Sequence, residues 1–258
     1  MKSPTLLLLI CTFLLCCKKG DDVVSASGNA VDTTGVKPVN TNQPAMATTF
    51  DLDPSEAPRF VKANYVELDS IYEVSLFRSG IGHDYSDDFE FCRSMKHYFK
   101  PKAGLWSSIK IYSPIDGTVV KIFSEWAGNQ VHIKSKDFPA FTVKIFHVNV
   151  KIDLKEGDKV VAGQQLGTHI GNQTMSDIAV AASTSLDGPK DNTNSEKGLR
   201  LISYFQVMSD SLFNSYQMFG ITSRNQLMID KAHRDAQPLT CNGESFNDVG
   251  TLSNWLRL

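Results

Sequence analysis

Four residues in three separate segments have side chains that could bind a metal ion or transfer a proton. His83 and Asp87 form an H-x-x-x-D pattern, His147 lies in the apolar run IFHV, and Asp177 lies further along the chain. Histidine nitrogens and carboxylate oxygens are zinc ligands, and histidine is also a common general acid or base. The ordinary alternatives are a hydrogen bond between His83 and Asp87 across a loop, and a buried, hydrogen-bonded His147.

Turns and short strands are expected to position these side chains. Glycines at both ends of residues 80–82 predict a turn that delivers His83. A short helix is expected over residues 88–97. From residue 109 to 182, apolar and polar residues alternate with the period of half-buried strands, as in NQVHIKS. The sequence therefore predicts a mainly β fold, built as a small sandwich or barrel of short strands.

The C-terminal quarter of the chain has a different pattern, which predicts helices. Apolar residues recur at helical spacing over residues 201–213. A second helix is expected to begin at Thr222 or Ser223, where Ser223 and Gln226 fit a capping box, and to end before Pro238. We therefore expect a C-terminal pair of α-helices packed on the β domain.

Three sequence features together resemble the lysostaphin/LytM family of zinc endopeptidases. They are the H-x-x-x-D pattern, the turn at Asp116-Gly117 and the segment GDKVVAGQQLG at residues 157–167. The last segment alone also resembles biotinyl and lipoyl carrier domains, but the modifiable lysine flanked by methionines is absent from the strand-rich region. The resemblance covers about residues 83–181. It implies the β-sheet fold of that family, which is called the duplicated hybrid motif.

The resemblance also implies roles for the four residues. In the family, zinc is held by the His and Asp of H-x-x-x-D and by the second His of a late His-x-His. A strand histidine and the first His of His-x-His assist the attacking water. Position by position, this puts His83 and Asp87 at the metal, and His147 and Asp177 in the catalytic places.

The third zinc ligand of the family is missing, because Ala179 falls at its position and alanine cannot bind zinc. A zinc hydrolase needs three protein ligands and an open place for water. We therefore expect no bound cofactor. Zinc is the ion that the site would take if Asp177, His147 or His169 replaced the missing ligand.

The missing ligand implies a degenerate, non-catalytic member of the family that binds peptidoglycan, another glycan or an envelope protein. The alternative is an active peptidoglycan endopeptidase with a rewired zinc site. A third interpretation is an accessory protein of an envelope assembly, which would use an exposed face of the C-terminal helices.

Residues 1–17 have the features of a lipoprotein signal. Lys2 precedes an apolar run that is too short to span a bilayer, and Cys16-Cys17 ends it. We take Cys17 as the lipidated residue and Cys16 as the alternative. The KKGDD sequence that follows resembles lipoproteins of Bacteroidetes, in which such residues favour export to the cell surface. The pattern predicts a lipid-anchored outer-membrane protein that is displayed on the surface.

The remainder of the chain divides into a tether and a folded region. Residues 18–50 are polar and aperiodic, which predicts a flexible tether. A peptidase-like β domain with an N-terminal extension is expected over residues 51–182, and a helical extension over 183–258. The net charge of −2 without a basic stripe argues against a nucleic-acid partner. Cys92 and Cys241 would suit either a disulfide or two buried thiols.

Overall fold

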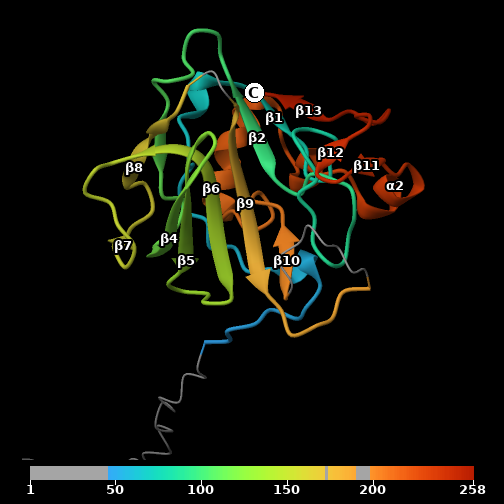
Figure 1. Ribbon diagram of the computed structural model, residues 1–258, viewed down its shortest axis with the longest axis horizontal. Coiled ribbons are helices and arrows are strands. Elements are labelled where there is room, and N and C mark those ends of the chain that lie inside the picture. Colours follow the sequence, from blue (N-terminus) through green and yellow to red (C-terminus); the bar gives the residue numbers. More distant parts are fainter. Residues whose placement is uncertain (1–45, 172–173, 190–197) are drawn as a thin grey trace, which may run out of the picture. The chain divides into compact units, whose positions relative to one another are not determined.

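The computed structural model describes residues 46–171, 174–189 and 198–258 (Figure 1). By its internal contacts the chain divides into two compact units, Met1–Asn42 and Gln43–Leu258, and every described residue belongs to the second unit. The expected lipidation site Cys17 and most of the expected tether therefore lie outside the described residues. None of the helices in the described part is long and apolar enough to cross a membrane.

An 11-stranded antiparallel sheet is the main element of this unit. Its strands are β1 (Ile71–Ser75), β2 (His97–Pro101), β3 (Lys110–Tyr112), β4 (Gly117–Glu125), β5 (Gly128–Ser135), β6 (Phe141–Val150), β7 (Lys159–Val160), β8 (Gln165–His169), β9 (Ser176–Ser183), β10 (Leu199–Ile202) and β13 (Trp255–Arg257). The main path runs β13-β1-β2-β9-β6-β5-β4-β7, while β10 pairs with β9 and β8 pairs with β3 and β6. A separate hairpin joins β11 (Cys241–Asn242) to β12 (Ser245–Phe246). In Figure 1, β9 and β6 cross the middle of the sheet.

The alternation of side chains gives the central strands two different faces. On β9, Ile178 and Val180 belong to the main hydrophobic core, and Ile145 lies opposite Ile178 on β6. Asp177 and Ala179 alternate with these residues, so they point to the other face of the sheet. The period of two that predicted the strands therefore also separates the apolar core from a second face that can carry charge.

Segments on both sides of the sheet region in the sequence complete the core. Tyr65 from the N-terminal extension and Tyr204 from the C-terminal region are buried in it, with ring centroids 5.9 Å apart. Phe50, which the expected tether contains, is also buried, and its ring centroid lies 5.1 Å from that of Phe141. The packed part of the chain therefore begins before residue 51.

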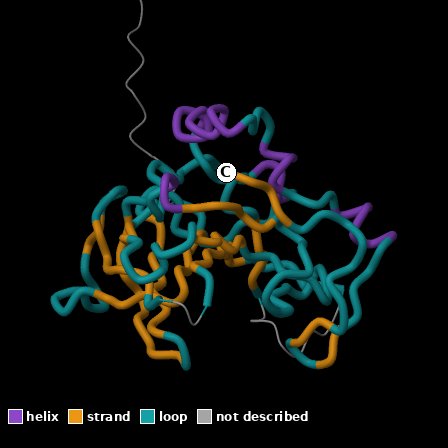
Figure 2. Tube along the Cα trace, turned by 90° about the horizontal axis from the view of Figure 1, so that it is seen from above, coloured by secondary structure: helices purple, strands orange, loops and turns teal. Residues whose placement is uncertain are grey.

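The prediction of a mainly β fold with a C-terminal pair of α-helices is confirmed, but the helices are shorter than the sequence patterns predict. They are α1 (Asp210–Phe213) and α2 (Lys231–Ala236). Four 3₁₀ helices complete the set: η1 (Pro54–Glu56), η2 (Leu68–Ser70), η3 (Asn214–Phe219) and η4 (Arg224–Leu227). Figure 2 shows the helices at the periphery of the molecule, outside the strands.

Three expected helices are corrected by the structure. The first residues of the stretch 201–213 lie in strand β10, whose pairing with the free side of β9 replaces helical hydrogen bonds. The capping box at Ser223 is present, but it begins the single 3₁₀ turn of η4. The helix expected over residues 88–97 is also wrong, because Cys92 has a φ of 54° that an α-helix does not allow.

Candidate functional site

A buried lysine lies at the centre of the residues that the sequence singled out. Lys96 Nζ is 2.6 Å from Asp177 Oδ2 and 3.1 Å from His83 Nε2. The other oxygen of Asp177 is 3.2 Å from His147 Nε2. The side chains of Lys96 and Asp177 are 2% and 0% exposed. We call Lys96, Asp177, His147 and His83 the Lys96 cluster.

The register of the central strands brings the cluster together. Asp177 on β9 lies opposite Tyr98 on β2. Lys96 precedes Tyr98 by two residues, so both side chains point to the face of the sheet that carries Asp177. Strand β6, which carries His147, lies on the other side of β9. The cluster is therefore built on three adjacent strands in the middle of the sheet.

An irregularity in β6 aims His147 at this site. His147 has a φ of 61°, in the left-handed region, and the pairing of β6 with β5 shifts register next to it. Ile145 and Val148 both belong to the main core, so the extra residue between them places Phe146 and His147 together on the opposite face. A non-glycine residue in this conformation costs about 1–3 kcal/mol. Such strain is typical of functional positions.

The partners of the two histidines fix their protonation. His147 Nδ1 is 2.9 Å from the carbonyl oxygen of Ala127, and its Nε2 faces the Asp177 carboxylate. Both partners only accept, so each contact favours a proton on the nitrogen that faces it, and the Asp177 carboxylate favours the imidazolium form of His147. His83 Nδ1 donates to the carbonyl oxygen of Asp84 at 2.9 Å, and its Nε2 accepts from the Lys96 ammonium. His83 is therefore neutral.

The pKa shifts agree with this assignment. Burial alone would lower the pKa of Lys96 and His147, but the Asp177 carboxylate outweighs burial and raises both. Burial would raise the pKa of Asp177, but Lys96 and His147 lower it below its usual value. Burial and the Lys96 charge lower the pKa of His83. Lys96 therefore stays an ammonium at neutral pH and cannot serve as a nucleophile or base.

Aromatic rings enclose the Lys96 ammonium. Its Nζ lies 4.0 Å from the ring centroid of Phe146, 4.7 Å from that of Tyr85 and 5.1 Å from that of Tyr98. The negative face of an aromatic ring attracts a cation, and this attraction is strongest away from water. The cage therefore holds the ammonium in place while keeping solvent away from it.

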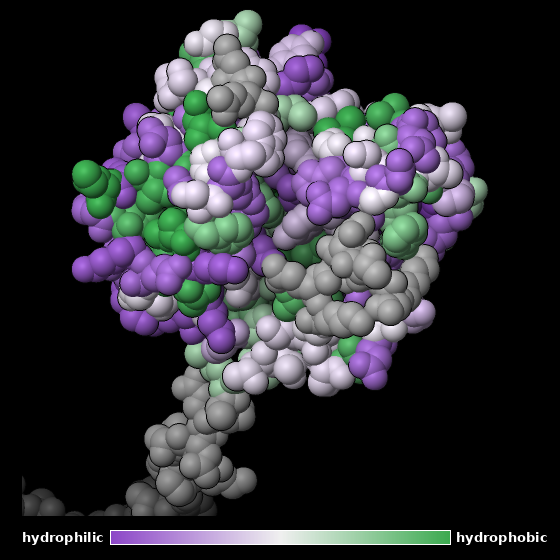
Figure 3. Space-filling view, viewed as in Figure 1, coloured by the Kyte–Doolittle hydropathy of each residue, from purple (hydrophilic) through white to green (hydrophobic). Residues whose placement is uncertain are grey.

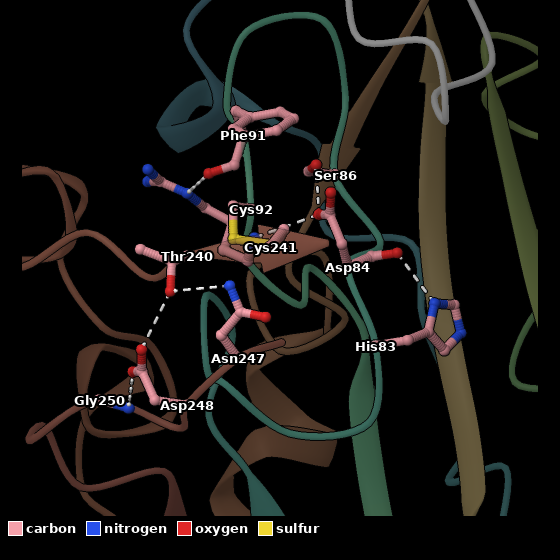
Figure 4. Close-up of a disulfide and its surroundings, with 11 residues drawn as sticks. His83, Asp84, Ser86, Phe91, Cys92, Thr240, Cys241, Asn247, Asp248 and Gly250 are labelled. Atoms are coloured by element: carbon pink, nitrogen blue, oxygen red, sulfur yellow. Dashed lines mark hydrogen bonds between the residues drawn. A yellow bond between two sulfur atoms is a disulfide. The ribbon is translucent and has the colours of Figure 1, made fainter. Parts of the chain in front are cut away.

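The loop that carries His83 is held at both ends. Gly82 has a φ of 77°, and a Cβ there would lie 2.1 Å from the Tyr98 hydroxyl oxygen, so this close approach requires glycine. Cys92 and Cys241 form a disulfide that ties the loop to the β11–β12 hairpin (Figure 4). In Figure 4 the imidazole of His83 lies apart from the disulfide, toward the strands of the sheet.

Asp87, the second metal ligand that the resemblance implies, does not join the Lys96 cluster. Its Oδ1 accepts hydrogen bonds from the backbone amides of Phe89 and Glu90, and its Oδ2 accepts one from Leu201 N at 2.7 Å. Asp87 therefore fixes its own loop against β10. This is a structural use of a carboxylate.

The residues present do not fit the zinc site that the resemblance implies. Among the described residues, no group of three or more His, Cys, Asp or Glu side chains is arranged to hold a metal ion. The Lys96 ammonium takes the space between His83 and Asp177, and like charge would repel a zinc ion from it. Ala179 is buried on the same face of β9 and contributes only a methyl group.

His169, the other substitute ligand considered, is buried on β8 at 1% exposure. Its Nδ1 accepts a hydrogen bond from the backbone amide of Gly171 at 3.1 Å. The same atom lies 2.9 Å from the carbonyl oxygen of Trp106. Its Nε2 has no hydrogen-bond partner among the described residues. His169 thus lies outside the contacts that join the Lys96 cluster.

Glu125 and Trp126 form the solvent-facing edge of the cluster. Glu125 Oε2 lies 3.8 Å from His147 Nδ1, and its side chain is 17% exposed. The Trp126 ring centroid is 6.1 Å from that of His147, and Trp126 is 78% exposed. Glu125 is the last residue of β4, and Trp126 follows it in the turn to β5. An exposed ring beside charged groups could stack on a ligand whose polar groups reach His147.

The face of the molecule seen in Figure 3 mixes hydrophilic and hydrophobic residues. Hydrophobic residues gather at the left of the view, on the side of β4 and β7. Three exposed apolar residues come from this part of the chain. They are Val120 in β4, Ile152 in the loop after β6, and Val161 directly after β7.

Lys96 is the central residue that the sequence patterns did not indicate. It lies in the run Met-Lys-His-Tyr-Phe at residues 95–99, whose members are all buried. A lysine flanked by apolar and aromatic residues in a strand-like run could have signalled a buried charge that needs a partner. The helix expected over residues 88–97 left this signal unused, because Lys96 was not assigned to a strand-like run.

Comparisons with known proteins found partial similarity to solved structures. No protein-family model matches the chain, and no curated protein matches its sequence. Solved structures similar to this chain include lysostaphin, with 16% identity over 43% of this chain and a TM-score of 0.28. A zinc-containing peptidase from Vibrio cholerae has 19% identity over 52% of this chain and a TM-score of 0.36. The M23 metalloprotease pseudoalterin has 14% identity over 52% of this chain and a TM-score of 0.30.

These likenesses are partial on both sides. The matched parts span 49% of the lysostaphin chain, 41% of the Vibrio peptidase and 73% of pseudoalterin. Identities and TM-scores this low give no information on the activity of this chain. Peptidases of the lysostaphin and M23 type are thus among the solved structures that resemble it, as its motifs imply.

Proposed function

We propose that this chain is a lipid-anchored protein of the cell envelope whose peptidase-like domain binds peptidoglycan, another glycan or a protein partner without cleaving it. The position of the Lys96 ammonium, between His83 and Asp177, carries the proposal. A positive charge that belongs to the protein lies where these two side chains would otherwise be open to a ligand. Zinc-dependent cleavage would require that ammonium to leave.

The proton inventory of the Lys96 cluster also supports binding rather than hydrolysis. Asp177 uses one oxygen for Lys96 and the other for His147. His147 Nδ1 donates to the carbonyl oxygen of Ala127, and His83 Nε2 accepts from Lys96. A general base must have a free lone pair within reach of the water that it activates. Neither of these two nitrogens offers one, and the Asp177 carboxylate is paired with the Lys96 ammonium.

The edge of the cluster offers a surface for a ligand. Trp126 projects into solvent next to the charged imidazolium of His147 and the carboxylate of Glu125. A tryptophan ring can cover the apolar face of a sugar ring, while charged groups bond its hydroxyls or amides. This combination supports a ligand that has both a flat face and polar substituents, as glycans and peptide side chains do.

The location in the envelope rests on the sequence of the first residues. The short apolar run that ends in Cys16-Cys17 has the features of a lipoprotein signal, with Cys17 as the proposed lipid-bearing residue. Display on the outer-membrane surface is part of the proposal. Labelling of whole cells with a membrane-impermeant reagent, and palmitate incorporation that is lost in Cys17→Ala, would test it.

A sedimentation assay tests the proposed activity. The fragment that begins at Gln43 contains the whole compact unit, including Phe50. Incubated with purified peptidoglycan sacculi and added zinc, it should sediment with them and release no soluble fragments. Trp126→Ala should weaken binding, whereas Met218→Ala, which alters a side chain that is 76% exposed elsewhere, should not.

The other outcomes separate the alternatives. Zinc-dependent release of soluble fragments that His83→Ala abolishes would replace the proposal by the active endopeptidase. If the fragment binds no sacculi or soluble glycan, but cross-links to one protein in intact cells through Trp126, the partner is a protein. Absence of all three results would overturn the proposal.

A further inference from the structure

Two donor atoms of the Lys96 cluster meet at one cation, and a third faces the same carboxylate. His83 Nε2 offers its lone pair to Lys96 Nζ at 3.1 Å, and Asp177 Oδ2 forms an ion pair with the same atom at 2.6 Å. His147 Nε2 is 3.2 Å from the second oxygen of this carboxylate. Imidazole nitrogen and carboxylate oxygen are the donor types that bind zinc and related divalent ions.

Both imidazoles are also oriented as ligand histidines are. His83 Nδ1 and His147 Nδ1 each lie 2.9 Å from a backbone carbonyl oxygen, that of Asp84 and that of Ala127. A backbone carbonyl on the far nitrogen is the usual device that turns the Nε2 atom of a histidine toward a metal ion. The left-handed backbone at His147 adds a strained position whose effect is to aim that ring.

The buried carboxylate explains why a cation is required here. Asp177 is 0% exposed, and its charge needs a positive partner to remain inside the protein. Lys96 supplies that charge from β2, within the aromatic cage. A metal ion would meet the same requirement, so lysine and metal are alternative occupants of one place.

We infer that Lys96 takes the place of a divalent metal ion, and that removing its ammonium gives this protein a zinc site made of His83, Asp177 and His147. The ammonium holds its partners at hydrogen-bond distances of 2.6 and 3.1 Å, whereas zinc ligands lie at ~2.0–2.2 Å. This spacing accounts for the lack of a preformed metal group among the described residues. Shifts of about 1 Å would bring His83 and Asp177 onto an ion. His147 would give up its Nε2 proton and turn from the second oxygen of Asp177 to join them. The inference does not depend on the proposed binding function.

Two substitutions test the inference on the chain from Gln43. Lys96→Ala removes the side chain, and Lys96→Met keeps most of its volume without the charge. Each variant would be dialysed against zinc at mildly alkaline pH and measured for bound metal by elemental analysis. Cobalt substitution would report tetrahedral coordination through its visible absorption. Lys96→Arg, which keeps a cation, and the double variant with His83→Ala are the matched controls.

The expected result is one zinc per chain in Lys96→Ala or Lys96→Met, with none in the unsubstituted protein, in Lys96→Arg or after His83→Ala. Loss of Lys96 leaves the Asp177 charge unpaired, so the variants could unfold without metal. Zinc should then restore a cooperative thermal transition, because an ion that binds only the native state stabilises it. Three results would each overturn the inference. In the first, both variants fold but bind no zinc. In the second, both variants are unfolded and zinc does not restore their structure, and in the third, the unsubstituted protein itself binds zinc.

Discussion

The Lys96 cluster can be compared with a second, largely buried charge cluster among the described residues, and the two differ in ways that bear on function. The second, which we call the Arg78 cluster, consists of Arg78, Glu90, Arg93 and Asp235. Arg78 donates a bidentate pair of hydrogen bonds to Glu90, one to each carboxylate oxygen at 2.7 Å. Arg93 donates a third hydrogen bond to the same carboxylate at 2.8 Å. Arg93 continues to Asp235 on α2. The cluster joins the His83 loop region to the C-terminal helix through planar forks of hydrogen bonds.

The Lys96 cluster is built from other chemistry. The Arg78 cluster consists of guanidinium and carboxylate groups and contains no histidine, the side chain whose ordinary pKa lies near neutral pH. The Lys96 cluster instead contains two histidines, one of them on strained backbone, and it reaches solvent at Glu125 and Trp126. Burial and ion pairing are common to both. Arg78 also lies on left-handed backbone, with a φ of 68°, so strain does not separate the clusters. The two histidines and the exposed Trp126 beside them distinguish the cluster that we assign to function.

Asp177→Ala should have the largest effect on stability. It leaves the Lys96 ammonium buried without a counter-charge, which costs about 3–5 kcal/mol. Asp235→Ala removes a partner that is 42% exposed at the edge of the Arg78 cluster, and should cost about 1 kcal/mol or less. Urea unfolding followed by circular dichroism measures both. Equal losses would contradict the difference between the clusters.

A double substitution sharpens that test. Lys96→Met with Asp177→Leu replaces the ion pair by apolar side chains and should recover most of the stability that Asp177→Ala loses. If the double variant is as unstable as the single one, the loss comes from packing rather than from an unpaired charge.

Replacing Cys92 and Cys241 by serine should lower the free energy of unfolding by about 2–4 kcal/mol. The disulfide lies beside Arg93, so the loss should fall on the region of the Arg78 cluster. Binding of sacculi at a temperature where the variant is folded should change little. A loss of binding that accompanies intact folding would show that the disulfide also positions the His83 side of the site.

The pH dependence of stability separates a core histidine from His147. His97 bonds the Ser75 carbonyl and the Ser203 hydroxyl, and burial lowers its pKa to about 4. The unfolded chain therefore binds an extra proton between its ordinary pKa of 6.5 and pH 4, and stability falls as the pH drops through that range. The loss at pH 4 should be about 2–3 kcal/mol. In His97→Gln this acid-sensitive part should disappear.

His147 should act in the opposite direction. Its pKa is raised in the folded state, so its contribution is present below pH 6.5 and is lost as the pH rises through the raised value. Denaturant titrations of His147→Gln across this range would show a flatter alkaline slope than the parent. A variant that instead lost stability only in acid would refute the imidazolium assignment.

Trp126→Ala should have the smallest effect on stability, within about 0.5 kcal/mol, because the side chain is 78% exposed. Its effect should appear in ligand binding alone. A large drop in the thermal midpoint would mean that Trp126 supports the fold, and the edge of the Lys96 cluster would lose its assigned role.

The sequence predicted those parts of the fold that depend on local pattern. Val131 and Ile133 alternate with polar residues, and the strand that they form has its apolar side in the core. The stretch 201–213 could not be assigned in this way. In the structure this stretch contains the end of strand β10, a turn and the single turn of α1. The pairing of β10 with β9, which is a tertiary contact, decides that its first residues form a strand rather than a helix.

The candidate site was predicted only in part, for a related reason. His83, His147 and Asp177 were found through motif spacing, and they do lie together. Lys96 belongs to no motif, and its place depends on the register between β2 and β9, which are distant in the sequence. Asp87 has the motif spacing of a ligand but bonds the backbone of Leu201 instead, a contact that no local pattern reveals.

The most direct test of the account is a crystal structure of the unsubstituted protein soaked in zinc, with anomalous data at the zinc edge. We predict no anomalous peak between His83 and Asp177, and density for Lys96 Nζ within hydrogen-bond distance of both. An anomalous peak at coordination distance from His83 and Asp177, with the Lys96 side chain turned away, would contradict the assignment of Lys96 as the resident cation.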